Sequence, residues 1–185
     1  MDEAVQLRAC DAARLIAYRG IDHYAHLPSN VFTVPGAYYF FDPEHLFNRS
    51  FPDKIGGVFR VDRTEALCLL DSDEIEGSGR SRHICISADT TGDGYMAEFD
   101  LGGPYGWRSA MHRHTLAPSS GEWIIYCDRR EEIGICSVHA PTSGIRSFFA
   151  EVSAFQIANP FGLRASQFFD RIKPEWLEKL LVNYG

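Results

Sequence analysis

Basic residues are scarce in this sequence: 18 lysines and arginines stand against 25 aspartates and glutamates, a formal net charge of −7 at pH 7. Binding of nucleic acid over a broad surface is driven largely by Lys and Arg, which release counterions from phosphates. The charge balance therefore argues against a nucleic-acid partner and favours a basic protein. No apolar run approaches the length of a bilayer span, and the first five residues are acidic where a secretory leader is basic. We expect a soluble, cytoplasmic protein that does not bind a membrane.

The sequence also lacks the short motifs that mark common catalytic sites. It has no HExxH unit for zinc and no GxSxG turn around a serine nucleophile. The glycine clusters at 77–79 and 102–106 lack the strand, the spacing and the following helix of a phosphate-binding loop. We therefore expect a protein that is not an enzyme and that carries no metal or other cofactor.

Cysteine is present in an odd number and in no CxxC pair, so neither a disulfide framework nor a zinc ribbon is indicated. The five cysteines are Cys10, Cys68, Cys85, Cys127 and Cys136. Most lie in apolar runs typical of strands. We predict reduced thiols in the core of a protein from a reducing compartment.

What the sequence does contain is enough apolar material for one core. Hydrophobic residues make up 45% and aromatic residues 13% of 185 residues. A chain of this length buries about 70% of its unfolded surface without help from disulfides or metals. We predict a single domain over residues 1–185.

The pattern of apolar residues predicts helices at both ends of the chain and strands between them. Residues 2–19 have helical spacing and stop at a glycine. Short strands are predicted at 37–41, 58–61 and 66–70, because β-branched and aromatic residues there are separated by Pro and Gly. Residues 71–82 are predicted to form an exposed loop.

Two β-hairpins are predicted in the second half, the first from residues 83–88 and 95–101, the second from 122–127 and 133–139. The glycine-rich segment 102–121 between them is predicted to be irregular. Helical spacing returns from 145 to 155, then in a short turn around residues 168 and 169, and in a last helix that starts at Pro174. The fold class is therefore α+β, with a mainly antiparallel sheet built from hairpins, an N-terminal helix and two or three C-terminal helices.

Carboxylates are concentrated between residues 71 and 100. If the loop after residue 70 and the first hairpin loop lie at one end of the sheet, these residues form one negative patch. Such a patch is either ordinary solvated surface or a docking face for a basic protein, in which exposed aromatic residues serve as anchors. The predicted contact residues are Asp71, Asp73, Glu74, Glu76, Tyr105 and Trp107; further carboxylates of the patch are Asp89, Asp93, Glu98 and Asp100.

A metal site is the alternative use of the same region. Counted as a twelve-residue calcium loop, residues 89–100 place Asp89, Asp93 and Asp100 at positions 1, 5 and 12. A hairpin turn rich in Asp and Gly explains the same letters. If residues 112–114 were extended, His112 and His114 would lie on one face of the chain and could begin a zinc site. These residues define the alternative hypothesis, a metal-dependent hydrolase or a calcium-binding domain.

The segment from residue 83 to about 155 contains a strand ICIS, an acidic turn ADTTGDG, a strand closing in EFDL, an aromatic strand EWIIYC and a helix GIRSFFAEV. This series resembles the SUKH superfamily, the Syd-like and cell-wall-regulator-like domains that frequently act as immunity proteins in bacterial toxin systems. The resemblance covers less than half of the chain. It implies an α+β domain without catalytic machinery that binds and blocks a toxin. Our hypothesis is therefore an immunity protein whose acidic, aromatic-bearing face neutralises a basic cognate toxin.

Overall fold

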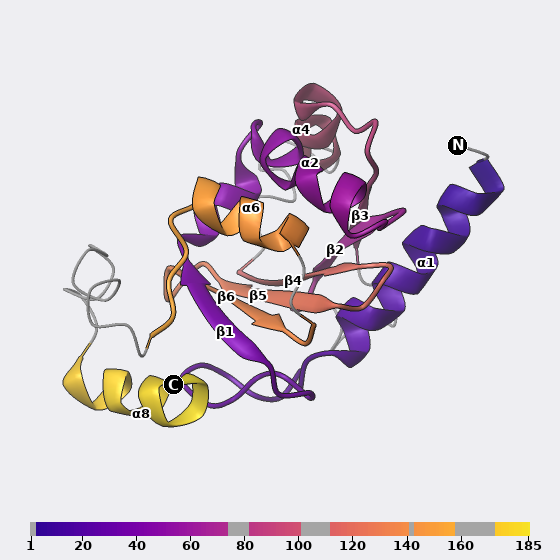
Figure 1. Ribbon diagram of the computed structural model, residues 1–185. Coiled ribbons are helices and arrows are strands. Elements are labelled where there is room, and N and C mark those ends of the chain that lie inside the picture. Colours follow the sequence, from indigo (N-terminus) through magenta and orange to yellow (C-terminus); the bar gives the residue numbers. More distant parts are fainter. Residues whose placement is uncertain (1–2, 74–81, 101–111, 141–142, 158–172) are drawn as a thin grey trace.

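A computed structural model describes residues 3–73, 82–100, 112–140, 143–157 and 173–185 (Figure 1). These residues form five α-helices, one short 3-10 helix and six strands. In chain order the elements are α1 (Glu3–Arg19), β1 (Ala37–Phe41), η1 (Pro43–Phe47), α2 (Phe51–Val61), β2 (Leu67–Asp71), β3 (His83–Ile86), α4 (Gly92–Asp100), β4 (Arg113–Pro118), β5 (Trp123–Asp128), β6 (Ile133–Val138), α6 (Ser143–Glu151) and α8 (Pro174–Tyr184).

The six strands form one antiparallel sheet in the order β1-β6-β5-β4-β2-β3. With α1 before the sheet and α6 and α8 after it, this arrangement confirms the predicted α+β class. The second predicted hairpin is confirmed as β5 and β6, which pair from Trp123 opposite Val138 to Asp128 opposite Ile133.

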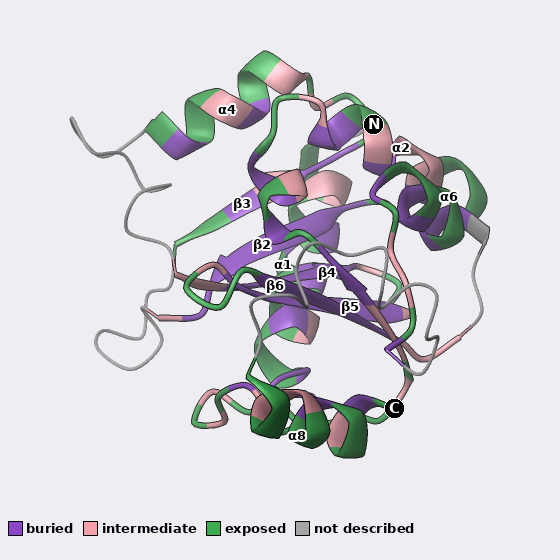
Figure 2. Ribbon diagram, turned by 90° about the vertical axis from the view of Figure 1, so that its left-hand side faces the viewer, coloured by how far each residue is buried: buried purple, intermediate pink, exposed green. Residues whose placement is uncertain are grey.

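Helices cover both faces of the sheet (Figure 1). On one face α2, α4 and α6 enclose a core that includes Phe51, Tyr95 and Phe148. On the other face α1 and α8 contribute Ala17 and Tyr184 to a second core. Figure 2 shows the strands as mostly buried, while the outer sides of α4 and α8 are exposed. Among the helices of the described ranges, none is both long enough and apolar enough to cross a bilayer.

The strand β4 was not predicted, because residues 113–118 were assigned to an irregular segment. In the structure β4 lies between β2 and β5, and five of its six residues are buried. Leu116 belongs to one core and Ala117 to the other, so the strand is covered on both faces. A strand that begins with Arg, His and Thr does not show the apolar alternation by which we recognise strands. The rest of the predicted irregular segment, 102–112 and 119–121, lies partly outside the described residues.

The predicted strand at 58–61 is wrong, because these residues form the last turn of α2. Phe51, Ile55 and Val58 have helical spacing and are fully buried, and a proline occupies the first turn. The two glycines inside the helix were interpreted as a turn. A Cβ built on Gly57 would lie 3.6 Å from the Cβ of Ser147, so this side of α2 is in ordinary packing contact with α6.

The first predicted hairpin is also wrong in its second half. β3 is a strand as expected, but residues 92–100 form the helix α4. The side chains four residues apart, Tyr95 and Phe99, are both fully buried in contact with each other. Thr91 caps the helix, because its Oγ1 accepts a hydrogen bond from the Gly94 amide at 3.1 Å. The spacing of Tyr95 and Phe99 and the capping residue Thr91 are sequence signals for a helix, but the Asp and Gly residues of the same segment favoured a turn.

The helix predicted from 145 to 155 ends earlier, since α6 stops at Glu151. Ser153 adopts a positive φ of 53°. Phe155 then forms a short bridge with Phe40 of β1, through hydrogen bonds of 2.7 and 3.0 Å between their backbones. The predicted helical turn around residues 168 and 169 lies outside the described residues. The last helix, α8, begins at Pro174 as predicted.

Candidate functional site

Asp71, a predicted contact residue, is the last residue of β2 and is only 3% exposed. It lies opposite His114 in the sheet. One of its carboxylate oxygens accepts a hydrogen bond from the Asp73 amide at 2.9 Å. The prediction that Asp71 lies in an exposed loop is therefore wrong, because the sheet extends one residue further than the apolar run.

Asp73 is half-buried and fully engaged by its neighbours. Its carboxylate accepts hydrogen bonds from the Arg113 amide at 2.9 Å, from Arg113 Nε at 2.5 Å and from the His112 amide at 3.2 Å. The same guanidinium donates to Nδ1 of His26 at 3.0 Å. Asp73 therefore ties the end of β2 to the start of β4, and its charge is neutralised within the fold.

The hydrogen bonds outweigh the burial of this carboxyl group. Burial alone would raise the pKa of Asp73, but the hydrogen bonds and the positive charge of Arg113, together with the His112 amide, lower it below its ordinary value. Asp73 is thus a structural carboxylate. The other predicted contact residues, Glu74, Glu76, Tyr105 and Trp107, lie outside the described residues.

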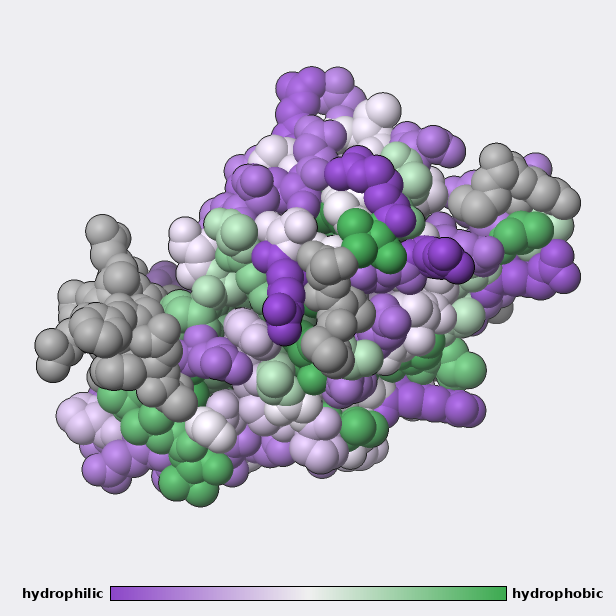
Figure 3. Space-filling view, viewed as in Figure 1, coloured by the Kyte–Doolittle hydropathy of each residue, from purple (hydrophilic) through white to green (hydrophobic). Residues whose placement is uncertain are grey.

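The exposed part of the predicted negative patch is α4 and the turn that precedes it. The side chains of Asp89, Asp93, Glu98 and Asp100 are all exposed. Residues 83–100 contain no lysine or arginine. Hydrophilic residues gather over α4 at the top of the space-filling view (Figure 3). An acidic surface of these four carboxylates, here called the α4 surface, therefore remains after Asp71 and Asp73 are removed from the patch.

Buried contacts hold the α4 surface in place. The Tyr95 hydroxyl donates to the Leu46 carbonyl at 2.6 Å, and the Tyr95 ring lies 5.4 Å from that of Phe51. The Phe99 ring lies 5.5 Å from that of Phe47. One side of α4 is thus fixed to α2 and η1, and the acidic side faces the solvent (Figure 2).

One cation neighbours the α4 surface in the described part of the chain. Arg49 forms an ion pair with Asp93, and the two side chains are 69% and 75% exposed. An exposed pair of this kind contributes little to stability and exchanges readily for another partner. The α4 surface therefore retains a strongly negative character.

The calcium-loop alternative requires a loop at residues 89–100, but most of these residues form a helix. Nine of the twelve counted residues, 92–100, belong to α4, so Asp93 and Asp100 project from a helix and do not wrap around a common point. Among the described residues there is no group of three or more His, Cys, Asp or Glu side chains that could hold a metal ion. The sequence spacing that suggested the loop is explained by a capped helix N-terminus.

The histidine alternative fails on burial. His112 precedes β4, whereas His114 lies within it and is completely buried. The His114 ring meets the Phe47 ring edge to face at 4.5 Å. Neither of its nitrogens has a hydrogen-bond partner among the described residues. Burial, with a smaller contribution from Arg129, lowers the pKa of His114 to about 3, so the side chain is neutral in the fold.

Cysteine chemistry differs from the prediction at two positions. Cys10 of α1 and Cys85 of β3 form a disulfide across a Cα–Cα distance of 5.8 Å, so these two are not free thiols. The residues around each cysteine do not indicate that α1 packs beside β3, which is what brings the two sulfurs together. Cys68, Cys127 and Cys136 are free and buried, as predicted.

The three free thiols are not nucleophiles. Cys127 lies directly opposite His114 in the sheet, a pairing that the sequence did not indicate. Burial raises the pKa of Cys68 to about 12 and those of Cys127 and Cys136 well above the ordinary value. Because the thiolate is the reactive form, the pair of Cys127 and His114 belongs to the core and carries no chemistry.

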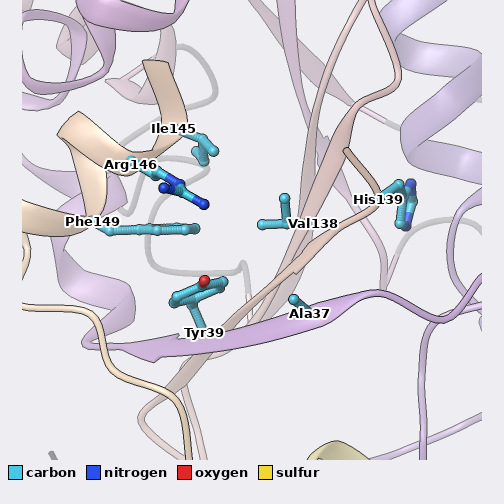
Figure 4. Close-up of a pocket in the computed structure, with 7 residues that line it drawn as sticks. All are labelled: Ala37, Tyr39, Val138, His139, Ile145, Arg146 and Phe149. Atoms are coloured by element: carbon cyan, nitrogen blue, oxygen red, sulfur yellow. The ribbon is translucent and has the colours of Figure 1, made fainter. Parts of the chain in front are cut away.

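A cavity of about 250 Å³ lies away from α4, between β1, the end of β6 and α6 (Figure 4). No motif in the sequence indicated it, because its residues come from three separate segments. It is lined by Ala37, Tyr39, Val138, His139, Ile145, Arg146 and Phe149.

Comparisons of the chain with family models, with curated proteins and with solved structures found no match. Of the five segments that carry the resemblance to SUKH domains, most of ICIS lies in β3, most of EWIIYC in β5 and most of GIRSFFAEV in α6. The other two differ from the expected turn and strand, because the last three residues of ADTTGDG begin the helix α4 and the residues EFD end it.

Proposed function

We propose that this protein is a binding module that captures and neutralises a basic protein toxin through its α4 surface. The observation that carries the proposal is the exposure of Asp89, Asp93, Glu98 and Asp100 on a segment without a basic residue. Complementary charge steers association and rejects wrong partners. The net charge of −7 adds to the attraction.

The way in which α4 is attached supports the same proposal. A docking surface costs less binding free energy when it is ordered before the partner arrives. Tyr95 and Phe99 are fully buried beneath the acidic side chains, so the helix is held by the core and not by the partner. The partial resemblance to SUKH domains also supports a role in immunity to a toxin.

The chemistry of the described residues favours binding over catalysis. The buried imidazole of His114 is neutral and enclosed, and the free thiols have raised pKa values. Asp73 is held in place by Arg113. These groups stabilise the fold, whereas the α4 carboxylates make few contacts of their own and are free to meet a partner.

A protection assay tests the proposal. The protein is co-expressed in a sensitive bacterium with the product of the reading frame adjacent to its own gene. We expect that this product arrests growth, that the protein restores growth, and that the two purify as a complex. A toxic product that this protein neither binds nor neutralises would contradict the proposed function.

A further inference from the structure

The cavity between β1, β6 and α6 combines apolar walls with a cation at its rim. Ala37, Val138 and Ile145 contribute aliphatic surface, and Tyr39 and Phe149 contribute rings. Small-molecule sites have this composition, mostly apolar with a few polar groups that fix orientation. The residues of the α4 surface are not among those that line it, so this cavity is a separate feature of the molecule.

The rings of Tyr39 and Phe149 stack on each other at one side of the cavity. Their centroids are 4.4 Å apart and their planes differ by 22°, so they are stacked. In Figure 4 the two rings lie one above the other, and Val138 faces them from β6. The space between the stacked pair and Val138 is therefore bounded by apolar side chains and suits an apolar group.

Arg146 supplies the positive charge. In Figure 4 its side chain leaves α6 above Phe149 and extends toward Val138. Arg146 is exposed and forms no ion pair with any described residue. A guanidinium presents its N–H groups as a planar fork that matches the two oxygens of a carboxylate.

A further polar atom at the cavity has no partner. Nε2 of His139 is buried and makes no hydrogen bond within the part of the chain that the structure describes. An imidazole nitrogen can donate or accept a hydrogen bond, so this atom is a polar group that a bound molecule could reach. In Figure 4 His139 lies on the far side of Val138 from Arg146.

We propose that this cavity binds a small aromatic carboxylate. The ring occupies the space between Val138 and the stacked pair, and the carboxylate accepts hydrogen bonds from Arg146. The volume of about 250 Å³ is below the range of about 300–1,000 Å³ typical of sites for drug-sized ligands, so the ligand is of single-ring size.

Amide NMR of the full chain with benzoate as the probe tests this proposal. We expect saturable shifts of the Ala37, Tyr39 and Val138 amides, with a dissociation constant on the order of 1 mM for a ligand this small. Benzamide, which keeps the ring but lacks the charge, and acetate, which lacks the ring, are each expected to bind at least about tenfold more weakly.

Two variants separate the charge from the cavity. Arg146→Gln is expected to weaken benzoate binding about tenfold or more, since its side chain is exposed and the fold does not depend on it. Ala37→Leu fills the cavity and is expected to abolish the shifts while Arg146 remains. The matched control is Arg130→Gln, an exposed arginine in the turn before β6, at the opposite end of that strand from Val138.

The proposal is overturned if benzoate produces no saturable shifts at these amides, if Arg146→Gln binds as tightly as the original protein, or if acetate binds as well as benzoate. Failure of this test leaves the protection assay unaffected, because the α4 surface contains none of the cavity residues.

Discussion

Gly144 of α6 lies directly against Val58 of α2: a Cβ built on Gly144 would be 2.8 Å from the Val58 Cα and 2.6 Å from Oδ2 of Asp62. The Gly144 amide also donates a hydrogen bond to the other Asp62 oxygen at 3.1 Å. The carboxylate at the end of α2 thus binds the first turn of α6, where negative charge is favourable. This contact joins the two helices that cover the sheet between α4 and the cavity.

Gly144→Ala is therefore expected to destabilise the protein, because the new methyl group meets backbone that cannot move without separating the helices. We expect the free energy of unfolding to fall by about 1–3 kcal/mol in a urea titration. Gly56→Ala is the matched control. No atom lies within 4 Å of a Cβ at Gly56, and Ala in a helix interior stabilises by about 0.5–1 kcal/mol relative to Gly. Equal effects of the two substitutions would contradict the close contact.

The errors in the predicted fold share one cause, which is that glycine and polar residues were read locally. Gly56 and Gly57 suggested a turn, but both lie inside the helix α2. DTTGDG suggested a hairpin, but Thr91 caps a helix there. The strands with short apolar runs, β1, β2, β5 and β6, and the helices with helical apolar spacing, α1 and α8, were predicted correctly.

The site was predictable only in part. The residue types alone predicted that the carboxylates of α4 form an acidic surface. Whether Asp73 is free or paired depends on Arg113, forty residues later, and on the strand β4 that the sequence concealed. The cavity depends on the packing of α6 against β1, which no local pattern reports.

The contact between Asp73 and Arg113 is expected to contribute to stability and not to binding. Asp73→Asn removes the charge that holds the guanidinium and the two amides, and we expect a loss of about 1–3 kcal/mol in unfolding free energy. Because the folded pKa of Asp73 is lowered, its contribution is present above the ordinary value of 3.8 and is lost as pH falls through the lowered value.

Asp93→Asn serves as the control for this substitution, since Asp93 pairs with Arg49 at the exposed surface. A change of less than about 1 kcal/mol is expected there. If Asp73→Asn were as mild as Asp93→Asn, Asp73 would be an ordinary surface carboxylate and the original docking prediction would regain support.

His114 is expected to make the protein sensitive to acid. Its pKa is lowered from 6.5 to about 3 in the fold, so between these values the unfolded chain binds a proton that the folded chain does not. The protein is therefore not destabilised by His114 above pH 6.5. Between pH 6.5 and about 3, this residue lowers the free energy of unfolding by about 1.4 kcal/mol for each pH unit.

His114→Leu removes the group that the unfolded chain protonates and puts an apolar side chain in the buried site. Chemical denaturation at several pH values between 6.5 and 4.5 should show that the free energy of unfolding falls less steeply with decreasing pH in the variant than in the original protein. If the free energy of unfolding had the same pH dependence in both proteins, the pKa of His114 would not be lowered by folding, which would contradict its complete burial.

The disulfide between Cys10 and Cys85 predicts a count of reactive thiols. When the purified protein is unfolded in denaturant and alkylated without reductant, mass spectrometry should find three labels, on Cys68, Cys127 and Cys136. After reduction it should find five. The bond closes a loop over a sequence separation of 75 residues, and its loss in Cys85→Ala is expected to cost about 2–4 kcal/mol. Five labels without reductant would show that the thiols are free.

The central claim is that the α4 surface meets a basic partner, and the rate of association with the toxin from the protection assay tests it most directly. Asp93→Lys, Glu98→Lys and Asp100→Lys are combined in one variant. The matched control reverses three exposed carboxylates on other helices, Glu151→Lys, Glu175→Lys and Glu178→Lys. Both variants have the same net charge, so only the location of the reversed charges differs.

We expect the α4 variant to associate at least about tenfold more slowly than the control at low salt, with the difference shrinking as salt screens the charges. Far-UV circular dichroism checks that both variants remain folded. Equal association rates for the two variants would contradict a docking role for α4. The surface that meets the partner would then lie elsewhere on the protein.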